Sequence, residues 1–435
     1  MTDHPTYEYS LSVTSQFYFC GLPLRLDSYG SCLYACQYCF AAARGGRRTP
    51  KALRIADAGY LSRLLSDVGR TPSVVREFLA ARQPIHFGGM SDPFPMIEAK
   101  LQISLRLLEI LAEHRYPTVI STKGTLMTRP DYLAVLSRGD FLVQVSFSTS
   151  DDRLSAAIDL GTPSPTARRR ALAKLADAGI KTACRLQPLL PGREVEGMAA
   201  LDQCAEVGAA HVGVEYLKLP IERWSGTARL SKALSRDLRL YYASVRAQRV
   251  GREWVLPIEL RLPTILSMRD RAHELGMSFG AADTDLLPMS DSACCCSGAD
   301  VLLRGGRSFE FNYLGAVRRA TSTGVVNFSS LSDVWTPTGS MARMINSRSR
   351  LRGPNGSGAS LADYIKANWN GRNNGCSPQM FHGVEPTGHV DTEGLNVYRV
   401  SGPLRHLLEG RSAAAPTAGP ALRRPTSPDR DHTLG

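Results

Sequence analysis

LDSYGSCLYACQYCF, the stretch from Leu26 to Phe40, carries three cysteines at spacings of four and three residues. Its small and polar residues follow a short strand-like run, so we expect a loop rather than a helix. Three thiolates in one loop can surround a single compact centre, and soft sulfur ligands favour iron–sulfur clusters or zinc. A structural zinc normally takes four protein ligands, whereas a [4Fe–4S] cubane held by Cys32, Cys36 and Cys39 leaves one iron open to a substrate or cofactor.

Two other chemistries would use the same loop. Cys20 could supply a fourth thiolate and complete a structural zinc site, as in a non-enzymatic zinc-binding interaction protein. Cys36 and Cys39 could instead form a redox pair, but Cys32 then has no role and no thioredoxin-like βαβ pattern surrounds the loop. The ligand count therefore favours the cluster.

The sequence around the loop predicts an α/β fold. Short β-rich runs alternate with amphipathic helical stretches, as in parallel strands joined by crossover helices. One unit begins a helix at Ser164 and Pro165, ends it near Gly179 and continues into a strand. Strands are expected at residues 85–87, 118–122, 141–148, 180–186, 211–216 and 277–281. Six or seven parallel strands within about 260 residues can form one α/β barrel.

The composition changes along the chain and suggests four segments. Residues 1–23 form an N-terminal segment and residues 24–285 the core barrel. Residues 286–410, richer in Gly, Ser and Asn, form a C-terminal extension that we expect to cover the open mouth of the barrel. Residues 411–435 combine Ala, Pro, Ser and charge without periodicity, which is typical of a disordered tail.

The chain of 435 residues has a formal net charge of +12, which attracts polyanions. Arg168, Arg169, Arg170 and the basic stretch between Arg236 and Arg252 are candidates for phosphate contacts. No apolar run approaches the roughly 20 residues that span a bilayer, and no secretory signal is visible, so we expect no membrane partner and a cytoplasmic protein.

The cysteine loop and four later motifs together resemble the radical S-adenosylmethionine (radical SAM) superfamily, and in particular its spore photoproduct lyase-like branch. The loop reads C-x3-C-x2-C with Tyr38 just before the last cysteine. The resemblance covers residues 24–192. The later motifs are SDP at 91–93, STKG at 121–124, VSFST at 145–149 and the helix start from Pro163 to Arg168.

The resemblance implies a partial (β/α)6 TIM-like barrel, a cofactor and a reaction. The open iron of the cluster is chelated by the amino and carboxylate groups of S-adenosylmethionine, and one electron, from a flavodoxin or ferredoxin type of donor, cleaves it to a 5′-deoxyadenosyl radical. Tyr38 would lie beside the adenine. The other implied contacts are Gly88, Gly89 and Asp92 on the methionyl amino side, Lys123 on the carboxylate side, and Ser148 near the ribose or methionyl group. The strand end reads GGMSDP instead of the GGE of many members, so Asp92 is an inferred substitute.

A second group of cysteines lies in the extension, at Cys294, Cys295, Cys296 and Cys376. An auxiliary cluster or metal site, a hydrogen-atom donor pair and structural thiols are all open interpretations. The lyase-like motifs and the basic charge favour a nucleic-acid substrate, DNA or RNA. The alternative is a peptide- or protein-modifying radical SAM enzyme in which these cysteines hold an auxiliary cluster.

Overall fold

The computed structural model describes residues 4–43, 53–67, 73–295, 297–340, 360–371 and 376–413. Its centre is an eight-stranded sheet in the order β1-β2-β4-β5-β6-β8-β9-β13. β1 (Leu11–Val13) pairs with β2 in the antiparallel sense, and all the other neighbouring pairs are parallel. The parallel strands are β2 (Leu24–Leu26), β4 (Ile85–Phe87), β5 (Thr118–Thr122), β6 (Phe141–Phe147), β8 (Lys181–Leu189), β9 (His211–Tyr216) and β13 (Ser278–Ala281). The predicted α/β class and partial barrel are confirmed.

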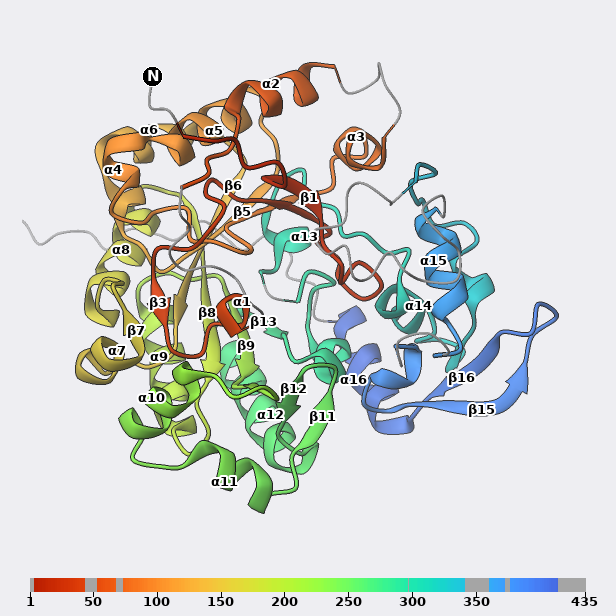
Figure 1. Ribbon diagram of the computed structural model, residues 1–435. Helices are drawn as coiled ribbons and strands as arrows, with labels where there is room; N and C mark the ends of the chain where they lie inside the picture. Colours follow the sequence, from red (N-terminus) through yellow and green to blue (C-terminus); the bar gives the residue numbers. More distant parts are fainter. Residues whose placement is uncertain are drawn as a thin grey trace, which may run out of the picture.

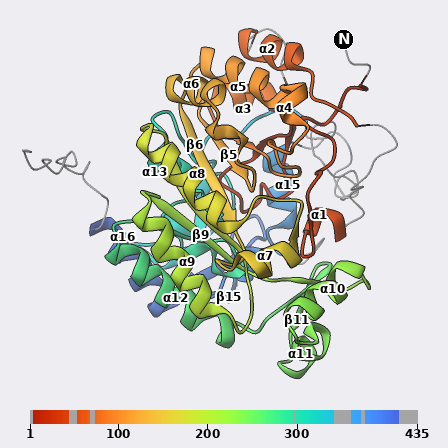
Figure 2. The ribbon, with the colours of Figure 1, turned by 90° about the vertical axis from the view of Figure 1, so that its left-hand side faces the viewer.

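Helices cover the outer side of this sheet (Figures 1 and 2). Their starts follow local chemistry: the Ser164 hydroxyl accepts a hydrogen bond from the backbone N–H of Ala167 at 3.3 Å, and Pro165 occupies the first turn of α8. The helices between parallel strands include α2 (Ala58–Ser66), α3 (Val74–Ala80), α4 (Glu98–Leu101), α5 (Ile103–Glu113), α6 (Pro130–Arg138), α7 (Asp152–Ile158), α8 (Pro165–Asp177), α9 (Glu194–Glu206) and α12 (Ile258–Glu274).

The sheet separates two apolar cores. Alternate residues of each strand face the helices, and these outward residues join the large core. The inward residues Val119, Leu142 and Ala183 belong to a second, small core with Leu22. Its other members come from the extension: Cys294, Ala299 and Leu303.

The first part of the extension closes the amino-terminal end of the barrel, and not the mouth as we expected. After η2 (Thr284–Met289) the chain reaches α13 (Ala299–Leu302), whose last carbonyl, on Leu302, accepts a hydrogen bond from Lys181 at the start of β8. The Asp140 carboxylate, just before β6, accepts from the N–H groups of Arg304 and Gly305 at 3.1 and 2.9 Å. The small core explains this position, because apolar side chains of residues 294–303 meet those at the beginnings of the strands.

The rest of the extension lies on one side of the barrel (Figure 1). It contains a three-stranded sheet in the order β14-β16-β15 and buries Trp369 completely. Its elements are α14 (Tyr313–Arg319), β14 (Val325–Val326), η3 (Phe328–Leu331), α15 (Leu361–Asn368), η6 (Pro378–Met380), β15 (Val384–Val390), β16 (Asn396–Val400) and α16 (Gly402–Ala413). Of the expected tail, residues 414–435 lie outside the described residues.

An insertion between β9 and α12 forms a small lobe below the barrel in Figure 2. Its three-stranded sheet has the order β10-β12-β11, so β11 is an edge strand. The lobe consists of β10 (Leu219–Pro220), α10 (Ser225–Ala233), α11 (Leu238–Ser244), β11 (Gln248–Val250) and β12 (Glu253–Val255). Among the described residues no helix is both long and apolar enough to cross a bilayer.

Candidate active site

The cysteine loop lies at the carboxyl end of β2, where loops of a parallel barrel converge. Two of its residues form β3 (Ala35–Cys36), which pairs in the antiparallel sense with β7 (Asp159–Leu160), so that Cys36 lies opposite Asp159. The backbone N–H of Gln37 donates to the carbonyl of Ile158 at 2.8 Å. The short helix α1 (Phe40–Ala43) follows the last cysteine. The loop is thus fixed by the segment after β6.

Asp159 is the charged centre of the site, and our sequence reasoning missed it. Its buried carboxylate accepts hydrogen bonds from Tyr38 and, at 2.8 Å, from Ser148. Lys123 lies 3.4 Å and Arg168 3.1 Å from its oxygens. Burial would raise the pKa of Asp159, but the two cations outweigh it and hold this pKa at about 2. Three predicted site residues, Tyr38, Lys123 and Ser148, therefore meet at one ionised carboxylate.

Lys123 keeps hydrogen-bond donors for a ligand. Its ammonium lies 5.4 Å from the centre of the Tyr38 ring, within cation–π range. It makes no hydrogen bond with a described residue beyond its ion pair to Asp159. Burial lowers the pKa of Lys123, which Asp159 partly opposes. A ligand carboxylate would add a second negative charge beside the ammonium, which fits the predicted role.

The strand ends after β4 and β5 are tied together by Asp92. One oxygen of Asp92 accepts from the hydroxyl of Thr122 at 2.7 Å, and the other accepts from the backbone N–H of Lys123 at 2.6 Å. Gly88 has φ of +91°, and a Cβ there would lie 2.4 Å from the carbonyl oxygen of Ser121. Gly89 approaches the side chain of Arg25. Asp92 therefore has structural partners, and its contact with a methionyl amino group stays a prediction.

A second missed carboxylate, Asp27, joins the cysteine loop to the β4 loop. It directly follows β2 and accepts from the backbone N–H groups of Met90 and Ser91, each at 2.9 Å. Burial raises its pKa to about 6. An Asp after a strand is common, so no sequence signal distinguished this one.

The three cysteines suit a metal cluster by their environment. Burial raises the pKa of Cys32 to about 12 and the pKa of Cys36 further, and the charge of Cys39 adds a smaller rise to both. Thiolates here need a cationic partner, which a coordinated iron supplies. No three His, Cys, Asp or Glu side chains in the described part of the chain are arranged to hold one ion. A cubane gives each thiolate its own iron, so its ligands are spread more widely than those of one ion.

Cys20, Cys294 and Cys295 lie at the opposite end of the barrel. Cys20 contacts the small core before β2, remote from a fourth-ligand position in the loop. The Cys294 thiol donates to the carbonyl of Gly21 at 3.6 Å, whereas the Cys376 thiol donates to the Tyr18 hydroxyl at 3.3 Å. The Cys295 backbone lies against β13, and Cys296 is outside the described residues. A second metal or cluster site stays a prediction.

The predicted phosphate contact of Arg168 is wrong. This side chain is fully buried, and besides Asp159 it donates to the carbonyl oxygens of Pro163 and Ser146 at 2.9 and 3.0 Å. Arg169 donates to Gln203, while Arg170 is exposed. Arg168 lies on the buried side of α8. The run of three arginines alone does not reveal which side of the helix is buried.

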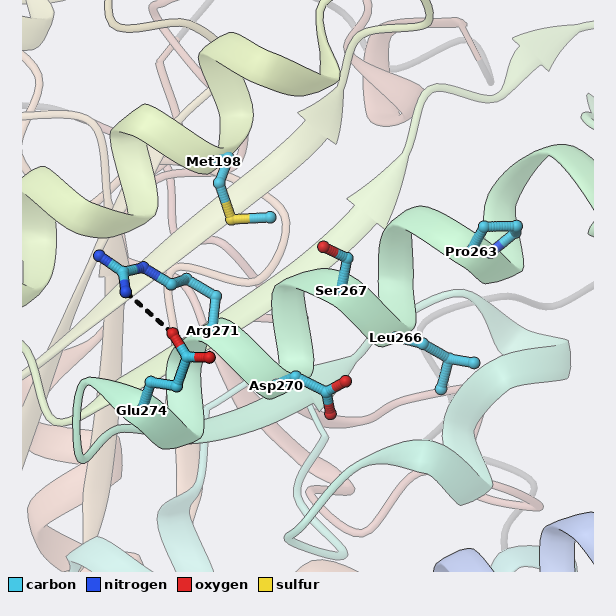
Figure 3. A pocket seen from close by; sticks show the side chains of 7 residues that line it. All are labelled: Met198, Pro263, Leu266, Ser267, Asp270, Arg271 and Glu274. Atoms are coloured by element: carbon cyan, nitrogen blue, oxygen red, sulfur yellow. Dashed lines mark hydrogen bonds and ion pairs between the residues drawn. The ribbon is translucent and has the colours of Figure 1, made fainter.

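A pocket in the outer layer lies between α9 and α12 and is lined by none of these groups (Figure 3). Its charged pair, Arg271 and Glu274, is an ordinary i,i+3 surface ion pair with a separation of 2.9 Å. The pocket lies on the helical side of the sheet and has no part in the site. Its lining consists of Met198, Pro263, Leu266, Ser267, Asp270, Arg271 and Glu274.

Residues 27–204 match the family model of the radical SAM superfamily. This segment begins at the residue after β2 and includes the cysteine loop, Asp159 and the strand ends described above. Residues 27–204 of the chain therefore form a radical SAM domain. The resemblance seen in the cysteine loop is confirmed.

Three relatives are similar over 211 residues at 28% identity: uncharacterized proteins of Mycobacterium bovis and of two strains of Mycobacterium tuberculosis. The match covers 46% of this chain and 60% of each relative. Among solved structures, a spore photoproduct lyase mutant with bound AdoMet and dinucleoside spore photoproduct is 15% identical, with a TM-score of 0.44 over 61% of this chain and 79% of that one. SuiB of Streptococcus suis bound to its precursor peptide SuiA is 16% identical, with a TM-score of 0.39 over 62% and 51%.

Proposed function

We propose that this protein uses a [4Fe–4S] cluster on Cys32, Cys36 and Cys39 to cleave S-adenosylmethionine reductively and act on a nucleic-acid substrate. The observation that carries the first part is the fixed cysteine loop at the carboxyl end of the strands, beside Lys123 and the ionised Asp159. When bound, the cluster supplies the electron that starts radical chemistry. The protein contributes Tyr38 and Lys123 as ligand contacts, and the buried carboxylate holds both side chains in place.

Anaerobic reconstitution tests the cofactor assignment. The wild-type protein with dithionite and S-adenosylmethionine should form 5′-deoxyadenosine, and a triple Cys32→Ala, Cys36→Ala, Cys39→Ala variant should form none and bind no iron. Cys184→Ala, in the outer core, is the matched control and should retain iron. Iron-free wild type, or zinc in its place, contradicts the proposal. A cubane retained by the triple variant would reveal an auxiliary site and support the peptide-modifying alternative.

The basic lobe supports the nucleic-acid part. Residues 219–256 contain eight Lys or Arg and three Asp or Glu. Arg246 and Arg249 are exposed and form no ion pair with a described residue. The lobe touches the site: the backbone of Gly226 in α10 packs so closely on Gln37 that a Cβ would lie 2.6 Å from its carbonyl oxygen. A polyanion bound on the lobe would therefore lie near the cysteine loop.

Salt-dependent binding tests this part. Wild-type protein should bind single-stranded or duplex DNA or RNA at low ionic strength, with an affinity that falls as salt rises. Arg246→Glu with Arg249→Glu should weaken binding at least about tenfold and reduce the salt dependence by about one ion per lost phosphate contact. Arg170→Glu, on the outer face of α8, should leave binding nearly unchanged. Absence of binding at low salt would remove nucleic acid as the substrate.

A further inference from the structure

The inner face of the barrel sheet is polar above its small apolar core. Arg25 on β2, His86 on β4, Ser121 on β5, Gln144 on β6 and Arg185 on β8 all occupy inward positions, because their strand neighbours join the outer core. A parallel sheet covered on both faces normally has apolar residues on both. Packing alone therefore does not explain why these inward positions are polar.

Solvent reaches this inner face. The strands of the sheet are otherwise buried, and every half-buried residue within them is an inward one. These residues are Arg25, Ser146, Lys181, Arg185, Gln187, Glu215 and Ser278. A ligand of the barrel would meet this face, with the cysteine loop at its carboxyl end.

The neutral members of the layer satisfy one another. Ser121 donates to the side-chain oxygen of Gln144 at 2.9 Å, so it accepts from His86 Nε2, which lies 2.8 Å away. His86 is thereby assigned as the Nε2–H tautomer. Burial, with Arg25 and Arg185, lowers the pKa of His86 and keeps it uncharged. Among the described residues Arg25 has the nearby carboxylate of Asp27, whose pKa it helps to lower, whereas no carboxylate pairs with Arg185.

Arg185 has no counterion in the part of the chain that the structure describes. Its guanidinium makes no hydrogen bond or ion pair with a described residue, and its Nε is shielded from solvent. Its neighbour in register on β9 is Gly213, which adds no side chain. A guanidinium in a partly dehydrated position is stabilised by a planar or tetrahedral oxyanion, which it binds through two parallel N–H groups.

We propose that Arg185 anchors an anion subsite on the inner face of the barrel, which takes a carboxylate or phosphate group of the substrate. Arg25, near the mouth, adds a second positive charge to the same face. The subsite rests on the proposed function in that its ligand is the substrate of the radical SAM reaction. A small terminal group fits this position, since the extension closes the far end of the barrel.

Calorimetric melting of the cluster-loaded protein, under anaerobic conditions, tests the subsite. Inorganic phosphate or acetate should raise the Tm of the wild type by about 2 °C or more, and the more effective anion identifies the group. In Arg185→Met the anion effect should disappear, while the Tm without anion should equal or exceed that of the wild type, because a charge without a counterion has been removed. Arg170→Met, an exposed control, should behave as the wild type.

Two results would overturn the subsite: equal anion stabilisation of Arg185→Met and wild type, or a Tm several degrees lower in Arg185→Met without anion, which marks a structural arginine. The measurement does not involve S-adenosylmethionine. A protein that forms no 5′-deoxyadenosine but shows the Arg185-dependent anion effect therefore contradicts the proposed function and supports the subsite. A protein that forms 5′-deoxyadenosine but shows no anion effect supports the proposed function and contradicts the subsite.

Discussion

Gly88 and Gly179 both have positive φ, +91° and +72°, but they differ in their surroundings. A Cβ at Gly179 would meet nothing within 4 Å, whereas one at Gly88 would lie 2.4 Å from the Ser121 carbonyl oxygen. We expect Gly179→Ala to cost about 1 kcal/mol of unfolding free energy, from backbone strain alone. Gly88→Ala should cost at least about twice as much, because β4 and β5 must separate. Urea unfolding measures the free energy of both variants. Equal losses of stability would contradict the close approach of Gly88 to the Ser121 carbonyl.

Asp159 should contribute strongly to stability. In Asp159→Asn the fully buried Arg168 loses its counterion, which costs about 3–5 kcal/mol. Asp57→Asn is the matched control: Asp57 caps α2 and pairs with Arg63 at the surface, Asn caps equally well, and the exposed pair contributes less than about 1 kcal/mol. Similar unfolding free energies for the two variants would show that Asp159 is not the counterion we describe.

His86 makes stability depend on pH. Because its pKa is lowered in the folded state, the unfolded chain takes up a proton first as the pH falls below about 6.5. This contribution to stability is present above that pH and is lost as the pH falls. Of the charged groups in the described part of the chain, the cations Arg25 and Arg185 act on His86, and no carboxylate there offsets them. Wild type should lose stability relative to His86→Gln between pH 7.5 and 5.5 in urea titrations. If the difference in unfolding free energy between wild type and His86→Gln does not change with pH, the pKa of His86 is not lowered in the folded protein.

At the scale of elements, α10 supports the cysteine loop. A methyl group on Gly226 in α10 would overlap both the Trp224 ring and the Gln37 carbonyl oxygen, so it must displace that ring and push the helix and the loop apart. Gly226→Ala should reduce the iron bound per chain after reconstitution, by about half or more, while the circular dichroism of the barrel is unchanged. Gly402→Ala, with nothing within 4 Å of the added carbon, should bind iron normally. Full iron content in Gly226→Ala would mean that the loop does not depend on the lobe.

At the scale of the whole molecule, the extension and the barrel form one folded unit through the small core and the Asp140 contacts. Asp140→Ala leaves the N–H groups of Arg304 and Gly305 without their acceptor, and should cost about 1–3 kcal/mol. It should also speed hydrogen exchange at those amides. Asp333→Ala loses only an ion pair with the exposed Arg319. This control should change the unfolding free energy and the exchange rates of those amides very little. Unchanged exchange rates in Asp140→Ala would show that the segment around Arg304 and Gly305 does not fold together with the barrel.

The sequence predicted the local features well. β4, β5 and β9 have the bounds that we expected, and the start of α8 was indicated by Ser164 and Pro165. These features depend on neighbours along the chain: alternation, turn residues and helix caps. The cysteine spacing belongs to the same class, since three ligands within one short loop need no distant partner.

Tertiary structure alone decided where the charges act and what the extension covers. Asp159 meets Lys123 and Arg168 because strands far apart in sequence end at the same edge of the sheet, and nothing in the surrounding residues indicates that closure. Arg168 is buried for the same reason. The first part of the extension lies at the amino-terminal end because its apolar residues match inward side chains of β5, β6 and β8, a complementarity that exists only once the sheet has curved.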